Sequence, residues 1–441
     1  MKFYDRKKEL EILDSVRNVA FSIHSQMTVL TGRRRIGKTN LILRSCDGHP
    51  AVYLFVSRSN EADLCARFCN EIRQSLDVLV PDYSKFSDLF RFLMDLGCRI
   101  KYDLIIDEFQ EFYYINPETF SLMQDIWDRY RKNSYVNLII SGSVYTLMTR
   151  IFKDAKEPLF GRADRIMRLE PFSTDVLKKV LGDYKPGYDN DDLLALYAFT
   201  GGVPKYVEQF MDNGCTDMES MVEFITQPDS SFSSEGQALL IQEFGKKYGN
   251  YFSILSAISN GRDTLPEMES AMGGISLGGQ LRRLEEDYAL VKRKRPILSK
   301  ENTQNVHYEM SDMFLRFWFR YFIKYRNYVE IGNYDRLAQI IKDDYTTYSG
   351  IALEMYFRQK MAESKDFAQI GSWWAGKNNV NQCEIDIVGL YAENRKALVA
   401  EVKRLPKNFK PERFAEKVEL LRRKVLFNYE IETRLLSMED M

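Results

Sequence analysis

Met27-Thr28-Val29-Leu30-Thr31-Gly32-Arg33-Arg34-Arg35-Ile36-Gly37-Lys38-Thr39 is the stretch of sequence that decides the fold. Its first five residues are apolar or β-branched, which is typical of a buried strand, and residues 38–45 have the pattern of a helix. The segment between them fits G-x-x-x-x-G-K-[ST], a loop whose backbone N–H groups surround phosphates. A strand before this loop and a helix after it are the context that the motif requires.

The residue types in this loop explain how it would bind a nucleotide. Glycines let the chain wrap around the phosphates, and the helix N-terminus adds positive partial charge. Lys38 is expected to reach the β- and γ-phosphates, and the Thr39 hydroxyl to coordinate Mg2+. We therefore expect ATP and Mg2+ as cofactors. The predicted nucleotide-binding residues are Gly32, Arg33, Arg34, Arg35, Ile36, Gly37, Lys38, Thr39 and Ser141.

Three further segments have the composition of buried strands, residues 51–56, 102–107 and 136–141, and helical patterns separate them. Strands that are almost entirely apolar and alternate with helices indicate a parallel sheet covered on both faces. The sequence therefore predicts an α/β fold of the P-loop NTPase type for the first part of the chain.

The strand at residues 102–107 ends in an acidic pair, Asp107 and Glu108. Asp107 stands at its carboxyl end, the edge where open α/β sheets bind ligands. We expect Asp107 to hold Mg2+ through water and Glu108 to act as general base toward the attacking water. An Asp-Glu pair alone is more often part of a solvated loop, but the phosphate loop nearby favours the functional interpretation.

Polar residues after the next strand are further candidates for the ATPase site, and each has a simpler structural explanation. Ser141 and Ser143 follow a strand, so a hydroxyl there could contact the γ-phosphate or the attacking water, although a simple turn explains them nearly as well. Arg162 follows a loop and is a candidate arginine finger, acting in cis or in trans, with a surface arginine as the alternative. Lys38, Glu108 and Arg162 are the expected catalytic residues of this part.

Seven segments spread over roughly the first half of the chain carry a resemblance to a known family: Phe3–Arg6, Glu9–Leu10, Gly32–Thr39, Leu104–Glu108, Ile140–Ser143, Leu159–Arg162 and Gly201–Pro204. They resemble the archaeal-type ATPases, which are AAA+-related ATPases of the signal-transduction (STAND) type. The resemblance implies an ATP-hydrolysing core followed by a helical lid that contains the Gly-Gly-Val-Pro segment.

Residues 248–299 resemble a winged helix, with three short amphipathic helices and then a basic strand. Residues 276–285 would be the recognition helix and residues 290–295 the wing. Residues 281–300 hold seven basic and three acidic side chains, a net charge of +4, which suits contacts with the phosphates of DNA or RNA. A helical spacer that packs on the ATPase is the alternative interpretation.

The segment from Asp312 to Tyr321 is rich in aromatic residues. Such a row could stack on nucleic-acid bases. Because the aromatics recur at helical spacing, we expect them to form a buried core instead.

An acidic and lysine set stands near the C-terminus. Asp386 ends a short apolar strand, and Glu401 and Lys403 share one face of the next strand. This is the D…E-x-K pattern of PD-(D/E)XK nucleases, in which Asp386 and Glu401 would bind Mg2+ and Lys403 would orient the water or stabilise the phosphorus. Glu354, on the preceding helix, would be a further metal ligand. Surface charge on an edge hairpin is the alternative interpretation.

This region also resembles the uncharacterised C-terminal domain that accompanies archaeal-type ATPases and is itself similar to PD-(D/E)XK nucleases. Gly371–Trp374 and the aromatic segment contribute to the resemblance. Residues 401–425 carry nine basic and four acidic side chains, a net charge of +5, beside the expected site. The resemblance implies a nuclease-like fold, and cleavage itself is a separate question because such folds often lose the chemistry.

Composition narrows the class of protein. The chain has 441 residues, a formal net charge of −1 and a hydrophobic fraction of 45%, which exclude a disordered chain and one that coats nucleic acid through bulk charge. No stretch approaches the roughly 20 apolar residues of a membrane span, and no targeting segment is apparent. Six scattered cysteines favour reduced thiols over a zinc site. We expect a cytoplasmic protein that does not bind membranes.

The length predicts about three domains. We expect an ATPase core at residues 1–170, a helical lid at 171–245, a winged helix at 246–300, and linker helices with a nuclease-like domain at 301–441. The sequence thus predicts an ATP-binding and ATP-hydrolysing AAA+/STAND-type protein that couples nucleotide state to a DNA-binding winged helix and a nuclease-like domain. The alternative is an ATP-dependent signalling switch that binds a protein partner, or another copy of itself, and cuts nothing.

Overall fold

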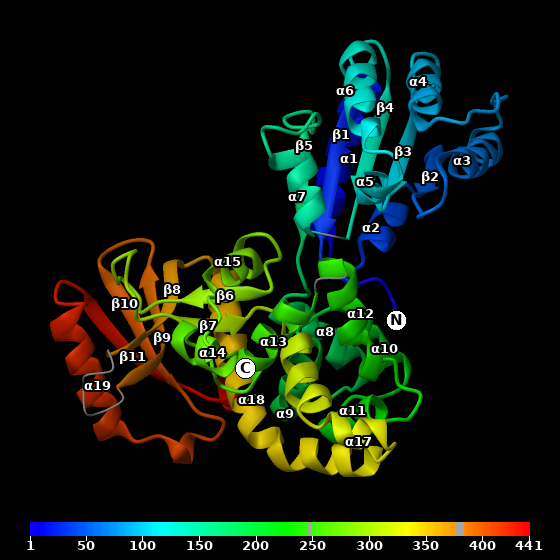
Figure 1. Cartoon of the computed structure of the whole chain (residues 1–441). Coiled ribbons are helices and arrows are strands. Elements are labelled where there is room, and N and C mark those ends of the chain that lie inside the picture. The colour runs from blue at the N-terminus through cyan, green and yellow to red at the C-terminus, as the bar shows by residue number, and fades with distance from the viewer. Residues whose placement is uncertain (144, 246–247, 376–382) are drawn as a thin grey trace. The chain divides into compact units, whose positions relative to one another are not determined.

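The structure, a computed structural model, describes residues 1–143, 145–245, 248–375 and 383–441. The chain forms two compact units, whose elements are labelled in Figure 1. The N-terminal unit is Asp5–Glu170, and the C-terminal unit comprises Met1–Tyr4 and Pro171–Met441. The expected boundary between lid and winged helix, at residues 245–246, reaches outside the described residues. None of the helices in the described ranges is both long and apolar enough to cross a membrane.

A five-stranded parallel sheet forms the centre of the N-terminal unit, with the strand order β2-β3-β4-β1-β5. The strands are β1 (Gln26–Gly32), β2 (Ala51–Phe55), β3 (Tyr102–Asp107), β4 (Val136–Ser141) and β5 (Arg165–Leu169). The four strands expected from the sequence are confirmed. The sequence pattern did not reveal β5, because this edge strand exposes most of its side chains and so lacks an apolar run.

Helices cover both faces of this sheet, as its apolar strands predicted. Leu30 and Ile139 pack in one cluster with residues of α1 and α2, whereas Val29 and Ile140 pack in another with residues of α3, α4 and α6. The helices of the unit are α1 (Lys7–Ser22), α2 (Lys38–Ser45), α3 (Glu61–Leu76), α4 (Phe86–Leu96), α5 (Phe112–Ile115), α6 (Glu118–Tyr130) and α7 (Tyr145–Lys153). Neighbouring residues of one strand thus face opposite layers of helices.

Helices open the main part of the C-terminal unit, as the sequence predicted. They are α8 (Thr174–Tyr184), α9 (Asn190–Thr200), α10 (Pro204–Asp212), α11 (Met218–Ile225) and α12 (Phe232–Phe244). The Gly-Gly-Val-Pro segment joins α9 to α10: Gly201 ends α9 with a left-handed φ of 57°, and Pro204 begins α10. A Cβ on Gly202 would lie 2.7 Å from the carbonyl oxygen of Phe172. The motif therefore has a structural reason, a tight turn between two packed helices.

Three helices and a two-stranded antiparallel sheet follow. They are α13 (Tyr248–Ser259), α14 (Leu265–Ala271), α15 (Gly278–Glu286), β6 (Val291–Lys294) and β7 (His307–Met310). The order of three helices and a hairpin is the one expected of the basic segment. The strand that pairs with β6 begins only after residue 300, so the hairpin extends past the expected end of that domain.

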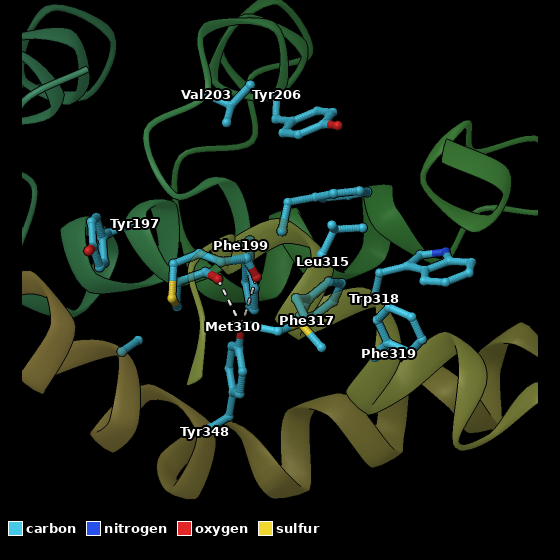
Figure 2. Packing of buried hydrophobic residues seen from close by; sticks show 14 of the residues in the cluster. Tyr197, Phe199, Val203, Tyr206, Met310, Leu315, Phe317, Trp318, Phe319 and Tyr348 are labelled. Atoms are coloured by element: carbon cyan, nitrogen blue, oxygen red, sulfur yellow. Dashed lines mark hydrogen bonds between the residues drawn. The ribbon is translucent and has the colours of Figure 1, made fainter. Parts of the chain in front are cut away.

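The aromatic segment after β7 is buried, which confirms the core interpretation. It forms α16 (Met313–Trp318) and a π-helical turn (Phe319–Ile323), and α17 (Arg326–Glu330) and the long α18 (Tyr334–Ser364) come next. Phe317 packs edge-to-face against Phe199 of α9, with ring centroids 5.1 Å apart. Figure 2 shows Tyr348 of α18 reaching toward this cluster, where its hydroxyl donates to the carbonyl of Ala198 over 3.1 Å. Phe317, Trp318 and Phe319 are buried in this core, as Figure 2 shows, so their rings are not exposed for stacking on nucleic-acid bases.

A four-stranded mixed sheet ends the chain, in the order β11-β10-β9-β8. Its elements are β8 (Phe367–Trp374), β9 (Glu384–Tyr391), β10 (Lys396–Val402), α19 (Pro411–Lys424) and β11 (Glu430–Leu436). Only β10 and β11 are parallel. Leu398 packs with the cluster that includes α18, and Val399 packs with α19, so the sheet lies between these two helices. The half-exposed edge strand β11 had no clear signal in the sequence.

Candidate functional site

The phosphate loop connects β1 to α2, as expected. Gly37 has a left-handed φ of 87°, and α2 begins at the next residue. The buried Lys38 donates from Nζ to the carbonyl oxygens of Gly32 at 2.9 Å and Arg33 at 3.1 Å. The ammonium is therefore held against the loop, where a bound phosphate would offer it a stronger, doubly charged partner.

Asp107 at the end of β3 accepts hydrogen bonds from residues of three elements, α2, β2 and β4. Thr39 donates to Oδ2 over 3.0 Å, Tyr53 of β2 donates to the same oxygen over 2.6 Å, and Ser141 of β4 donates to Oδ1. The structure thus brings together Thr39, Asp107 and Ser141, three of the residues that the sequence singled out. Tyr53 was not predicted, because its role depends on the pairing of β2 with β3. Burial, and then the hydrogen bond to Asp107, raise the pKa of Tyr53.

These residues fit a magnesium ion. Mg2+ prefers oxygen ligands and is usually held by one or two side chains together with water and substrate phosphates. The Thr39 hydroxyl and the Asp107 carboxylate lie in direct contact at the carboxyl edge of the sheet. They would hold the ion beside the phosphates that the loop binds.

Glu108 is fixed in position by two side chains. Its Oε2 accepts hydrogen bonds from the Ser143 hydroxyl over 2.7 Å and from the side-chain amide of Gln110. Gln110 is fully buried, and its Oε1 has no hydrogen-bond partner within the described part of the chain. A Cβ on Gly142 would lie 2.3 Å from that oxygen, so the glycine leaves room for Gln110. Gln110 was not predicted from the sequence, because no sequence pattern indicates that the side-chain amide two residues after Glu108 is buried.

The contacts of Arg162 lie outside the group formed by Thr39, Asp107 and Ser141. It pairs with Asp128 of α6 at 3.1 Å and donates to the carbonyl of Phe160 over 2.9 Å. Within residues 1–143 and 145–245, its hydrogen bonds and its ion pair do not involve the phosphate loop. A role as arginine finger therefore stays a prediction.

The C-terminal set converges on Lys403. Its ammonium lies 3.0 Å from Oε1 of Glu401 and 3.6 Å from Oδ2 of Asp386. Asp386 also accepts from the backbone N–H of Val402 over 2.8 Å. Lys417 of α19 makes a second ion pair with Glu401, at 2.9 Å, and was not predicted. Burial would lower the pKa of Lys403, but the nearby carboxylates, Asp386 first, outweigh it and raise the pKa.

Glu354 of α18 lies near Asp386 of the C-terminal set. Burial, and next the charge of Asp386, raise the pKa of Glu354 to about 7. Arg358, one turn later, lies 3.2 Å from the Glu354 carboxylate, donates to the carbonyl of Asp386 over 3.1 Å and lies 3.6 Å from Glu309 of β7. Arg358 is a second residue that sequence reasoning missed.

The metal site expected of Glu354, Asp386 and Glu401 stays a prediction; in this structure basic side chains contact these carboxylates. Among the described residues, no three His, Cys, Asp or Glu side chains are placed to hold a metal ion. The physical reason is that basic side chains already occupy the carboxylates: two lysines pair with Glu401, and an arginine pairs with Glu354. The structure brings the predicted residues together but gives them ammonium and guanidinium partners.

Two protein-family models match separate parts of the chain. A model of an ATPase domain predominantly from Archaea matches residues 3–210, and a model of archaeal and bacterial proteins of unknown function matches residues 318–412. The resemblance to archaeal-type ATPases and to their uncharacterised C-terminal domain is confirmed. The nuclease-like assignment stays a prediction.

Individual proteins are similar over most of the chain. An uncharacterized protein of Methanocaldococcus jannaschii is 30% identical over 414 residues, which cover 91% of this chain and 87% of that protein. The Walker-type ATPase of Pyrococcus abyssi matches with a TM-score of 0.54 at 18% identity and covers 72% of this chain and 96% of its own. The ORC2 protein of Aeropyrum pernix matches with a TM-score of 0.47 at 11% identity, over 78% and 96%. The Pyrococcus likeness shows a shared fold.

Proposed function

Because the chain belongs to the same family as its Methanocaldococcus jannaschii relative and has an archaeal-type ATPase domain at residues 3–210, it is an ATP-hydrolysing enzyme, and we propose that it uses MgATP to control its C-terminal unit. One observation carries the proposal for the site. Thr39, Asp107 and Ser141 come from three segments and meet in one hydrogen-bonded group at the carboxyl edge of the sheet, beside the phosphate loop. Ligands bind at that edge in open α/β sheets.

The side chains of the N-terminal unit have distinct roles in this proposal. Lys38 binds the β- and γ-phosphates, and Thr39 and Asp107 hold Mg2+, which neutralises the phosphate charge when bound. Glu108 accepts a proton from the attacking water through the carboxylate that Gln110 and Ser143 orient. Arg162 is proposed to stabilise the charge of the transition state from a neighbouring copy, since its own contacts lie along α6.

Two variants test the assignment of the ATPase site. Lys38→Ala is expected to lose ATP binding, whereas Glu108→Gln is expected to bind ATP normally and to hydrolyse it about 100-fold or more slowly. Binding is measured with a fluorescent ATP analogue, and hydrolysis by phosphate release. Wild-type rates in both variants would refute the assignment.

The segment from α13 to β7 is proposed as a winged helix that binds nucleic acid. Its three helices and antiparallel hairpin support the fold, and α15 exposes Arg282 and Arg283 while its leucines are buried. On the hairpin, Lys292 and Arg293 are exposed. Exposed cations on a helix and an adjacent wing suit the phosphates of a DNA or RNA backbone. In this division the core is residues 1–170, the lid 171–245, and the nuclease-like domain follows the hairpin.

The C-terminal sheet is proposed as a nuclease-like domain. The order of one helix, three strands, a helix and a strand, with Asp386, Glu401 and Lys403 gathered at one point, supports it. The competing proposal is a signalling switch in which these domains bind a partner and cut nothing. The two ion pairs of Glu401 favour the switch, because a carboxylate neutralised by Lys403 and Lys417 is a poor metal ligand.

One assay separates the two proposals. The full-length protein is incubated with single- and double-stranded DNA and RNA, with Mg2+ or Mn2+, with and without ATP. Cleavage that disappears in Lys403→Ala and Asp386→Ala supports the nuclease. Salt-dependent binding without cleavage supports a nucleic-acid-binding role without the nuclease, and the absence of both binding and cleavage rejects the nucleic-acid role and favours the switch.

A further inference from the structure

A cavity of about 320 Å3 lies inside the C-terminal unit, and its lining differs from that of both sites described above. Residues of the α13–β7 segment form one side, and residues of α16 to α18 form the other. Ile258, Met310 and Ile351 contribute an apolar wall. The volume falls at the lower end of the range of about 300–1,000 Å3 that is typical of small-molecule sites.

The charged residues of the lining are unequal in number. The basic ones are Lys294, Arg316, Arg320 and Lys324, and the acidic ones are Asp263 and Glu309. Both acids already have partners: Glu309 lies 3.4 Å from Arg316 and 3.6 Å from Arg358, and Asp263 lies 2.8 Å from His307. Both carboxylates of the cavity wall therefore have partners within the protein.

Two further lysines line the cavity, Lys294 and Lys324, and the charge of Lys294 helps to hold the pKa of Glu309 below its ordinary value. Neither Lys294 nor Lys324 forms an ion pair with a carboxylate of residues 248–375 or 383–441. Arg320 is held in place by Asp344 at 2.7 Å and lies over the ring of Tyr348, 5.8 Å from its centroid. The residues that line the cavity thus carry a net positive charge. One of them, Arg320, is held in a fixed orientation by its ion pair with Asp344.

We propose that this cavity binds a small organic phosphomonoester. The phosphate would be held by Lys294, Lys324 and Arg320, and the organic body would lie against the apolar wall. Arginine and lysine together match a dianionic phosphate well, since the guanidinium is a rigid fork and the ammonium a mobile point charge. A free mononucleotide and the 5′-phosphorylated end of a nucleic acid share this chemistry.

The test uses the full-length Lys38→Ala protein, so that binding at the phosphate loop does not contribute. Isothermal titration calorimetry compares AMP with adenosine, and a 5′-phosphorylated dithymidine dinucleotide with its unphosphorylated form. We expect each phosphate to improve the affinity about tenfold or more. A preference for AMP assigns the site to free small molecules, and a preference for the dinucleotide assigns it to nucleic-acid ends.

Variants locate the binding. Lys294→Ala with Lys324→Ala is expected to lower the affinity for AMP about tenfold or more, whereas Lys300→Ala, an exposed lysine outside the lining, is expected to leave it unchanged. Circular dichroism melts confirm that the variants fold. The proposal is overturned if neither AMP nor the phosphorylated dinucleotide binds more tightly than its unphosphorylated form, or if the double variant binds the preferred ligand as well as its parent.

Discussion

The Thr39 hydroxyl donates a hydrogen bond to Oδ2 of Asp107 over 3.0 Å. The contact joins the first turn of α2 to the end of β3, two elements far apart in the sequence. It places two oxygen ligands of the kind that Mg2+ prefers at one point of the sheet edge. The fold alone therefore assembles the metal-binding side of the ATPase site.

Removal of that hydroxyl is expected to weaken the use of Mg2+. Thr39→Ala should hydrolyse MgATP about tenfold or more slowly and need more Mg2+ for its half-maximal rate, because one oxygen ligand is lost. Thr39→Ser keeps the hydroxyl and should stay near the wild type. Phosphate release across a Mg2+ titration measures both, and an unchanged Mg2+ dependence in Thr39→Ala would count against the assigned ligand.

Gln110 is expected to act on catalysis through Glu108. Gln110→Leu keeps the site filled but removes the donor to Oε2 of Glu108, so the carboxylate is less well oriented. We expect kcat to fall about tenfold while the Kd for ATP stays the same.

A double-mutant cycle provides the control for this positioning role. In a Glu108→Gln background, Gln110→Leu should cause no further loss of rate, since the group that it orients is already absent. Equal losses in both backgrounds would mean that Gln110 matters to the structure rather than to Glu108.

The sequence predicted most of the N-terminal site because its signals are local. Each inner strand is an apolar run, and Lys38, Thr39 and Asp107 stand directly at strand or helix ends. Tyr53 and Gln110 have no such signal. The first depends on which strand pairs beside β3, and the second depends on a space left by a glycine in another loop.

The C-terminal site shows the same limit. Alternation along β10 placed Glu401 and Lys403 together correctly. Lys417 and Arg358 come from helices that pack on opposite faces of the sheet. A local sequence pattern does not predict which residues of a helix will contact which residues of a sheet. These two basic residues add ion pairs that the sequence pattern did not reveal, and the metal site itself stays a prediction.

His307 is expected to titrate above its ordinary pKa of 6.5. The hydrogen bond that His307 donates to Asp263 raises the pKa of His307 most, while burial and Lys294 oppose it. The pair therefore stabilises the folded chain fully below about pH 6.5, and that contribution is lost as the pH rises through the higher folded value. NMR titration should show a lower pKa in Asp263→Asn, with His24 and His49 as internal controls. An unchanged value for His307 would contradict the pairing.

Arg17 and Asp103 form a buried ion pair in the N-terminal unit. Arg17 of α1 is 2% exposed, and its Nε lies 2.9 and 3.0 Å from the two carboxylate oxygens of Asp103, which is fully buried. Asn137 of β4 donates to the same carboxylate over 2.7 Å. Arg17→Met leaves this charge buried without its cation, so we expect a loss of about 3–5 kcal/mol in the free energy of unfolding.

Two comparisons make that prediction sharp. Arg44→Ala removes a pair with Asp47 in which both side chains are more than half exposed, and it should cost about 1 kcal/mol or less. Arg17→Met with Asp103→Asn should recover part of the loss, because the unpaired charge is gone. Hydrogen exchange of β3 amides reports the stability of this unit, and Arg17→Met should accelerate it about 100-fold or more. If Arg17→Met and Arg44→Ala exchange at the same rate, the pair contributes no more than a surface contact.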